Sequence, residues 1–153
     1  MSVYSDLTSE EFVEAIKPTV QKICREYEIY PSVCMAQACI ESQFGKGVIG
    51  NYNLFGRKDN GEGPSVKDVL TQEEINGTME TVRADFEDYT SLEEAIKDYC
   101  VLITEDEKYA AVMDAVYDFD EYVETLASIY ATDSAYGDLI KTVIIEWDFR
   151  LLD

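Results

Sequence analysis

The feature that most constrains how this chain can fold is the stretch "VCMAQACI", which Glu41 follows at once. Its residues are apolar except for Gln37. A helix that is apolar around its whole circumference is stable only when other elements cover it. Pro31 is favoured in the first turn of a helix, and Gly45 is typical of the residue that ends one. The sequence therefore predicts a buried central helix over residues 31–44.

Further amphipathic segments predict that other helices surround this one. Thr8 and Glu11 have the spacing of a capping box at the start of a helix, and Ser91 and Glu94 repeat that spacing. The apolar residues behind each box recur at helical intervals. The predicted helices lie within residues 8–29, 31–44, 91–103, 106–116, 120–130 and 134–152, the last of them behind Thr132 or Asp133.

One segment carries the pattern of β-strands instead. Asn76-Gly77 is a strong tight-turn dipeptide, and Val82, Ala84 and Phe86 alternate with polar residues as in a strand with one buried face. We expect a hairpin lobe at about residues 65–88. The predicted fold class is mainly α (α+β): a single helical domain, spanning the whole chain from residue 1 to 153, with a small β-hairpin lobe.

Composition excludes several kinds of partner. The chain has 153 residues and a hydrophobic fraction of 46%, enough for the core of one domain. Its 32 acidic and 12 basic residues give a net charge of −20, which opposes binding to nucleic acid and to anionic membranes. A run of roughly 20 apolar residues, as a transmembrane helix needs, is absent, and the N-terminus lacks the pattern of a secretory signal.

The absence of histidine narrows the chemistry further. It excludes Ser-His-Asp and Cys-His nucleophiles and every metal site with a histidine ligand. The four cysteines, at positions 24, 34, 39 and 100, form no C-x-x-C pair and stand among apolar residues, so we expect buried free thiols. Carboxylates, tyrosines and amides remain as candidates for catalysis, and no metal or cofactor is implied.

Glu41 is the carboxylate in the most unusual position. It shares a helix face with Cys34, Gln37 and Ala38, which holds it against apolar surface near the helix end. A carboxyl group without a partner in such surroundings tends to stay protonated, as the general acid of a glycosidase must. The alternative is that Glu41 simply leaves the core at the helix end and is solvated.

Several motifs occur in an order that resembles one known family. "AQACIESQFGKG", "NYNLFGRK", "TQEEINGTMETVRADFEDYTSLEEAIKDYCVLI" and "YATDSAYGDLIKTVI" are similar to the motifs of the peptidoglycan glucosaminidases of glycoside hydrolase family 73. This family includes the flagellar rod hydrolase and many autolysins. The resemblance covers roughly residues 8–146 and implies a lysozyme-like helical fold with a mobile β-hairpin lobe over the cleft.

The resemblance implies catalytic roles residue by residue. Glu41 aligns with the family's general acid. Glu73, in "TQEE", aligns with a second carboxylate on the β-lobe, which acts as a base for water unless the substrate's own acetamido group assists. Glu74 is the neighbouring alternative, and either residue is otherwise an ordinary exposed strand position. Tyr130, in "YATD", aligns with a cleft tyrosine that positions substrate or water, although a tyrosine at a helix end can also simply pack its ring.

Four further residues are candidates for substrate binding. Asn53 is expected either to hydrogen-bond a sugar or to hold its loop, and Tyr136 either to line the cleft or to pack locally. Phe55 belongs to the same N-L-F-G motif as Asn53, and a core position is favoured for its ring. Gln37 lies on the same helix face as the proposed acid.

The resemblance implies cleavage of the β-1,4 bond between N-acetylglucosamine and N-acetylmuramic acid in peptidoglycan glycan strands. Two alternatives stay open: muramidase or lytic transglycosylase chemistry on the same scaffold, and a catalytically silent wall-binding or phage-structural module. We expect a monomer with no nucleic-acid or membrane partner. It would be made in the cytoplasm without a signal peptide and act on the bacterial cell wall, as a phage lysin or a trimmed autolysin domain.

Overall fold

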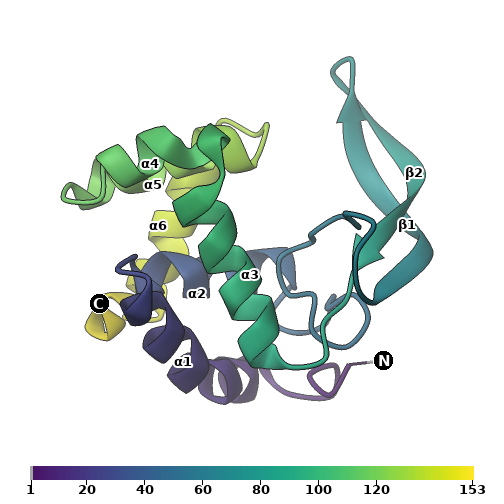
Figure 1. Ribbon diagram of the computed structural model, residues 1–153, viewed down its shortest axis with the longest axis horizontal. Coiled ribbons are helices and arrows are strands. Elements are labelled where there is room, and N and C mark those ends of the chain that lie inside the picture. Colours follow the sequence, from purple (N-terminus) through teal and green to yellow (C-terminus); the bar gives the residue numbers. More distant parts are fainter. Residues whose placement is uncertain (1) are drawn as a thin grey trace.

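The helices of this protein gather around α2 (Pro31–Glu41), and a two-stranded hairpin projects from them (Figure 1). The computed structural model describes residues 2–153. Helix α2 packs against α1 (Ser9–Glu26), α6 (Tyr136–Glu146) and the turn Phe149–Leu152. The remaining elements are β1 (Ser65–Ile75), β2 (Thr78–Glu87), α3 (Leu92–Glu105), the turn Glu107–Tyr109, α4 (Ala110–Asp114) and α5 (Phe119–Tyr130). The predicted fold class, mainly helical with one small hairpin, is confirmed.

Helix α2 is the buried centre that the apolar run predicts. All of Pro31–Cys39 is buried. The helix ends at Glu41, so the predicted end at Phe44 was wrong. The reason is that Gln43 and Phe44 adopt left-handed backbone conformations, with φ of 52° and 54°. The Ser42 hydroxyl also donates to a carbonyl of the preceding turn at 2.6 Å. Glu41 is therefore the last helical residue, at the point where the chain leaves the core.

The helices that flank α2 begin much as their capping residues predict. At α1, the Thr8 hydroxyl accepts from the Glu11 amide at 3.1 Å, and the Glu11 carboxylate accepts from the Thr8 amide at 3.0 Å. At α3, the Ser91 hydroxyl accepts from the Glu94 amide at 3.2 Å, but the Glu94 carboxylate binds the Thr90 amide at 3.1 Å. The second capping box is only half formed because Thr90 also offers its hydroxyl to that carboxylate.

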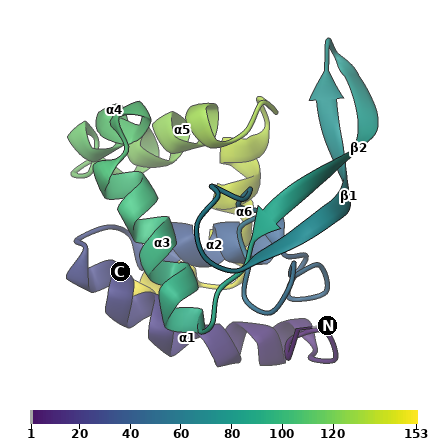
Figure 2. The same cartoon turned by 45° about the vertical axis from the view of Figure 1, so that its right-hand side comes forward.

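Strands β1 and β2 form the antiparallel hairpin, joined by the predicted Asn76-Gly77 turn. Both turn residues have positive φ, 53° and 81°, which is the conformation that favours Asn-Gly in a tight hairpin. Val82, Ala84 and Phe86 are more buried than the polar residues between them, so the predicted alternation is confirmed. A two-stranded sheet buries little surface by itself, and the tip of this one stands clear of the helices (Figure 2).

The C-terminal segment differs from the single predicted helix over residues 134–152. Asp133 accepts from an amide two residues further on at 2.9 Å, so it closes a turn ahead of α6 instead of capping the helix. Helix α6 ends at Glu146, and Asp148 then adopts a left-handed conformation with φ of 54°. The chain continues as the separate turn Phe149–Leu152. This reversal lets the C-terminal turn pack against α2.

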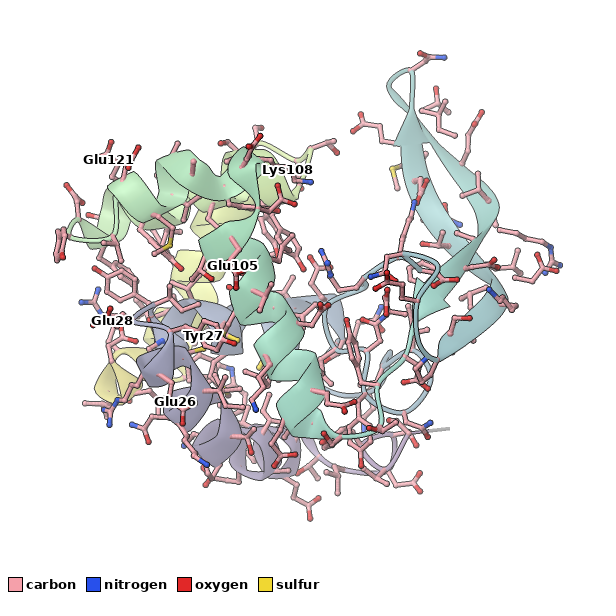
Figure 3. All side chains as sticks on the ribbon, viewed as in Figure 1. Glu26, Tyr27, Glu28, Glu105, Lys108 and Glu121 are labelled. Atoms are coloured by element: carbon pink, nitrogen blue, oxygen red, sulfur yellow. The ribbon has the colours of Figure 1, made fainter. Side chains whose placement is uncertain are left out.

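The thiols of the chain lie in the core, whereas many of its carboxylates lie on the surface. All four cysteines are buried and free, as predicted. Acidic side chains such as Glu26, Glu105 and Glu121 extend outward from the helices into solvent (Figure 3). Across residues 2–153, none of the helices combines the length and the apolar character that crossing a membrane would require.

Candidate active site

A cleft of about 970 Å³ lies between the hairpin and the connection from α5 to α6. It brings together Glu41, Glu73, Tyr130 and Phe55 from the predicted site. The other lining residues are Gly56, Lys58, Gln72, Glu74, Met79, Ala131, Thr132, Asp133 and Ser134. Segments far apart in the chain therefore meet in one concave, largely polar site, as a binding cleft requires.

Glu41 lies where the last turn of α2 reaches this cleft. Burial raises the pKa of its carboxyl group above the usual value of 4.5, and a hydrogen bond from Tyr136 partly opposes that rise. The Tyr136 hydroxyl donates to Glu41 Oε1 at 2.8 Å. Within residues 2–153, no hydrogen bond reaches Oε2. The carboxyl group can therefore hold a proton on an oxygen that the protein leaves free.

Two stacked tyrosines accompany Glu41. The rings of Tyr130 and Tyr136 are nearly parallel, with 7° between their planes and centroids 6.1 Å apart. Tyr130 lines the cleft, and its hydroxyl donates to the Phe55 carbonyl at 3.0 Å. Tyr136 is only 5% exposed and touches the acid instead of lining the cleft. Burial raises the pKa of both phenols, so each stays a hydrogen-bond donor at neutral pH.

The structure corrects the expected substrate contact of Gln37. This side chain is 0% exposed, and it is held between two tyrosines. Its Nε2 donates to the Tyr136 hydroxyl at 3.3 Å, and its Oε1 accepts from the Tyr99 hydroxyl at 2.5 Å. Gln37 therefore cannot touch a glycan in this conformation, and it reaches Glu41 only through Tyr136.

Asn53 holds its loop, which was one of the two roles considered for it. The side chain is 1% exposed. Its Nδ2 donates to the carbonyls of Arg57 and Glu87 at 2.8 and 2.9 Å, and its Oδ1 accepts from the Arg57 amide at 3.0 Å. The two contacts with Arg57 brace the loop itself, and the contact with Glu87 joins the loop to the end of β2. Of the two roles considered for Asn53, the structure shows the loop contacts, and the 1% exposed side chain is not placed to touch a sugar in this conformation.

Phe55 belongs to the same motif. Its ring packs in the core, and the residue also lines the cleft. Its ring is 3% exposed and stacks on Tyr99, with centroids 4.6 Å apart. Its carbonyl accepts the hydrogen bond from Tyr130 described above. The favoured core position thus holds for the ring, while the backbone of the motif supports the cleft wall.

The two candidate partner carboxylates both line the cleft, with different partners. Glu73 forms an ion pair with Lys58, on the same side of the cleft. Glu74 accepts from the Thr132 hydroxyl at 3.3 Å, which is a contact between the hairpin and the connection from α5 to α6. The hairpin thus carries one carboxylate paired with a cation and another that bridges the cleft.

Asp88 is a structural residue of the site that the sequence did not reveal. Its carboxylate is buried and accepts from the amides of Asn51 and Tyr89 at 3.0 and 2.8 Å, joining the end of the hairpin to the loop before Asn53. Glu87 beside it is also buried, and it accepts from the Asn60 amide at 3.0 Å. No periodic signal marks such residues, because their partners are loop amides.

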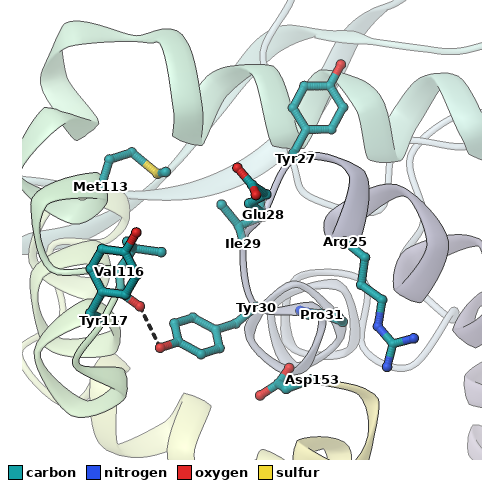
Figure 4. Close-up of a pocket in the computed structure, with 10 residues that line it drawn as sticks. All are labelled: Arg25, Tyr27, Glu28, Ile29, Tyr30, Pro31, Met113, Val116, Tyr117 and Asp153. Carbon is teal, nitrogen blue, oxygen red and sulfur yellow. Dashed lines mark hydrogen bonds between the residues drawn. The ribbon is translucent and has the colours of Figure 1, made fainter.

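A second cavity, of about 490 Å³, lies apart from this cleft (Figure 4). Tyr27, Tyr30, Val116 and Tyr117 are among its lining residues, and the Tyr30 hydroxyl donates to the Val116 carbonyl at 2.6 Å. It shares no lining residue with the cleft and includes none of the predicted site residues. Within residues 2–153, no group of three or more cysteine, aspartate or glutamate side chains is arranged to hold a metal ion.

The fold and the cleft together define the class of protein. A carboxyl group whose pKa is raised by burial, beside further carboxylates in an open polar cleft, is the arrangement with which glycosidases protonate a leaving group. These features, on a helical body with a hairpin lobe, are those of a glycoside hydrolase of lysozyme-like fold.

Comparison with known proteins identifies the family within this class. The chain belongs to the glucosaminidase family: the model of that family, described as mannosyl-glycoprotein endo-beta-N-acetylglucosaminidase, matches residues 17–148. This membership confirms the resemblance seen in the motifs.

Two of the similar proteins carry names that state different activities. The exo-glucosaminidase LytG of Bacillus subtilis (strain 168) is 30% identical over 93% of this chain and 52% of its own length. A probable N-acetylmuramidase of Lactococcus lactis subsp. cremoris (strain MG1363) is 29% identical over 95% of this chain and 35% of its own. The chain thus spans about half or less of these two relatives.

A solved structure shows that the similarity extends to the whole fold. The crystal structure of a peptidoglycan hydrolase mutant from Sphingomonas sp. A1 superimposes with a TM-score of 0.80 at 30% identity. The match covers 95% of this chain and 97% of that one.

Proposed function

We propose that this protein is a peptidoglycan hydrolase that cleaves the β-1,4 bond between N-acetylglucosamine and N-acetylmuramic acid. The cut would leave N-acetylglucosamine at the new reducing end. The observation that carries the proposal is Glu41, half-buried in the cleft, with its pKa raised by burial and its Oε1 held by Tyr136. The name of LytG supports glucosaminidase activity, and the name of the Sphingomonas hydrolase supports peptidoglycan as the substrate.

Glu41 acts as the general acid in this proposal. In its protonated form it gives a proton to the glycosidic oxygen while the bond to the anomeric carbon breaks. General acid catalysis of this kind contributes about 10²–10⁴-fold to a rate. Because its pKa lies above the usual 4.5, the protonated form persists to higher pH than in an exposed glutamate.

Glu73 is the proposed partner carboxylate. It lines the cleft from β1, with Lys58 holding it in place. Its role is that of a base for the attacking water, which would invert the anomeric centre; assistance by the substrate's acetamido group is the alternative. Glu74 is the second choice, since it is engaged with Thr132. Tyr130 positions substrate or water from the cleft wall, where the Phe55 carbonyl holds its hydroxyl.

The site of action in this proposal is the bacterial cell wall, with residues 1–153 working as one catalytic domain on glycan strands. Muramidase chemistry is the second candidate, and the name of the Lactococcus relative favours it. It would need the same acid and cleft, and it differs in which of the two sugars lies on the reducing side of the cut.

The experiment that tests this function is digestion of purified peptidoglycan, followed by borohydride reduction and mass spectrometry of the fragments. Wild type and Glu41→Gln are compared side by side. Fragments that end in reduced N-acetylglucosamine, absent with the variant, are expected. Reduced muramic acid or anhydro ends would overturn the bond assignment, and no fragments from several wall types would favour a silent binding module.

A further inference from the structure

A chain of hydrogen bonds runs from the buried core to the Glu41 carboxyl group. The Tyr99 hydroxyl, on α3, donates to Gln37 Oε1 at 2.5 Å. Gln37 Nε2, on α2, donates to the Tyr136 hydroxyl at 3.3 Å. The Tyr136 hydroxyl, on α6, donates to Glu41 Oε1 at 2.8 Å. Side chains from three helices thus form one continuous series, which we refer to as the Tyr99–Glu41 relay.

The chemistry of its members gives this relay one direction. An amide nitrogen only donates hydrogen bonds and an amide oxygen only accepts them, while a hydroxyl has a single hydrogen to donate. Since Gln37 Nε2 already donates to the Tyr136 oxygen, the Tyr136 hydrogen cannot point back toward Gln37. It points at Glu41 Oε1 instead.

Tyr99 decides which way the Gln37 amide is turned. Tyr99 is 1% exposed, and within residues 2–153 Gln37 is the only hydrogen-bond partner of its hydroxyl. The reversed amide would place Nε2 against Tyr99 and leave a buried O–H without an acceptor, which is costly. The orientation with Oε1 toward Tyr99 is therefore the stable one, and a residue of the buried core sets it.

We propose that Gln37 is a positioning residue for catalysis: it fixes the Tyr136 hydrogen on Glu41 Oε1, so that the proton of the acid resides on Oε2. This inference rests on the proposed role of Glu41 as general acid. With Oε1 occupied as an acceptor, a protonated Glu41 must carry its hydrogen on the oxygen that has no partner within residues 2–153. That proton is then available to a glycosidic oxygen. Without Gln37, the acid is free to donate its proton to the Tyr136 oxygen instead.

The other ionisable groups near Glu41 do not replace this contact. Tyr130, on α5, stacks on Tyr136 and donates to Phe55. Within the described residues, no donor other than Tyr136 bonds the Glu41 carboxylate. The charged groups that share the cleft with it are Lys58, Glu73, Glu74 and Asp133.

The first test is Gln37→Met, which nearly keeps the volume and removes both the oxygen and the nitrogen of the amide. We expect kcat on solubilised glycan strands to fall by about tenfold with little change in KM, because only delivery of the proton is impaired. The alkaline limb of the kcat/KM profile should move up by about one pH unit. Without the hydrogen bond from Gln37, the Tyr136 hydroxyl is a weaker donor to the ionised carboxylate and is free to accept from the protonated one. Tyr99→Phe should produce the same changes more weakly.

The matched control for Tyr99→Phe is Tyr122→Phe. Tyr122 is also fully buried, and its hydroxyl is the buried side-chain polar atom without a hydrogen-bond partner in the described part of the chain. Its variant loses the same atom from the same kind of site, so the pH profile should stay as in wild type. Equal shifts in both tyrosine variants would assign the effect to core packing and overturn the proposal.

A double-mutant cycle provides the decisive measurement. Gln37→Met in a Tyr136→Phe background should cause no further shift of the pH profile, because Gln37 acts only through the Tyr136 hydroxyl. Additive effects, or a single Gln37→Met profile identical to wild type, would overturn the relay. Failure of the proposed function looks different: wild type would release no fragments, or Glu41→Gln would keep its activity.

Discussion

Glu41 and Glu73 reach the same cleft from elements that are held in opposite ways. Glu41 ends a helix that is buried throughout Pro31–Cys39, and Tyr136 contacts it from α6. Glu73 stands on a two-stranded sheet whose apolar side chains Leu70 and Met79 are 60% and 61% exposed. A hairpin with so few buried contacts has low local stability. The proposed proton donor is therefore fixed by the core, and its proposed partner stands on an element with few buried contacts.

The largest expected effect on activity comes from removing the proposed proton donor, Glu41, at the end of the buried helix. Glu41→Gln should lower turnover of peptidoglycan by about 10²–10⁴-fold, because an amide cannot protonate the leaving oxygen. The far-ultraviolet circular dichroism spectrum should match that of wild type, since glutamine has nearly the same shape. Turnover within tenfold of wild type would remove Glu41 from the role of acid.

The difference in packing between α2 and the hairpin is tested by shortening one apolar side chain in each. Met35→Ala in α2 should lower the free energy of unfolding by about 2–5 kcal/mol, because it opens a cavity at a 0% exposed position. Leu70→Ala in the hairpin should change it by no more than about 0.5 kcal/mol. Urea unfolding measures both. A similar loss from the two variants would mean that the hairpin is as firmly packed as the helices.

The role of the hairpin is tested by comparing Glu73→Gln with Glu74→Gln. If Glu73 is the base, its variant should lose about 10²-fold in kcat, whereas Glu74→Gln, which keeps a hydrogen-bond acceptor for Thr132, should lose no more than a few-fold. The two variants control for each other, since they remove one charge each from adjacent positions of β1. The reverse ranking would assign the role to Glu74, and full activity of both would favour assistance by the substrate.

The smallest effect is a pH-dependent change in stability. Because burial raises the pKa of Glu41 in the folded protein above 4.5, its contribution to stability is full below that value and is lost as pH rises through the folded pKa. Glutamine does not titrate. The free energy of unfolding of wild type relative to Glu41→Gln should therefore fall as pH rises above 4.5, as urea titrations at several pH values can measure. A difference that grows with pH would contradict the raised pKa.

Short-range patterns predicted much of the fold because the physics behind them is local. The apolar run in residues 33–40 indicated a helix covered on all sides, and Asn76-Gly77 indicated the turn that β1 and β2 share. Prediction failed at helix ends. The left-handed residues Phe44 and Asp148 carry no local mark, and they end α2 and α6 because of how the following chain must turn back onto the core.

Some features of the site could also be predicted from the sequence, and others only from the tertiary structure. By itself the sequence determined the family, the buried helix that leads to Glu41, and the candidate carboxylates of the hairpin. Only the tertiary structure decided that Gln37 and Asn53 face the protein instead of the cleft. Gln37 lies 62 positions from Tyr99 and 99 from Tyr136 along the chain. A hydrogen bond depends on distance and direction in space, so no local pattern specifies partners that only the packing of three helices brings together.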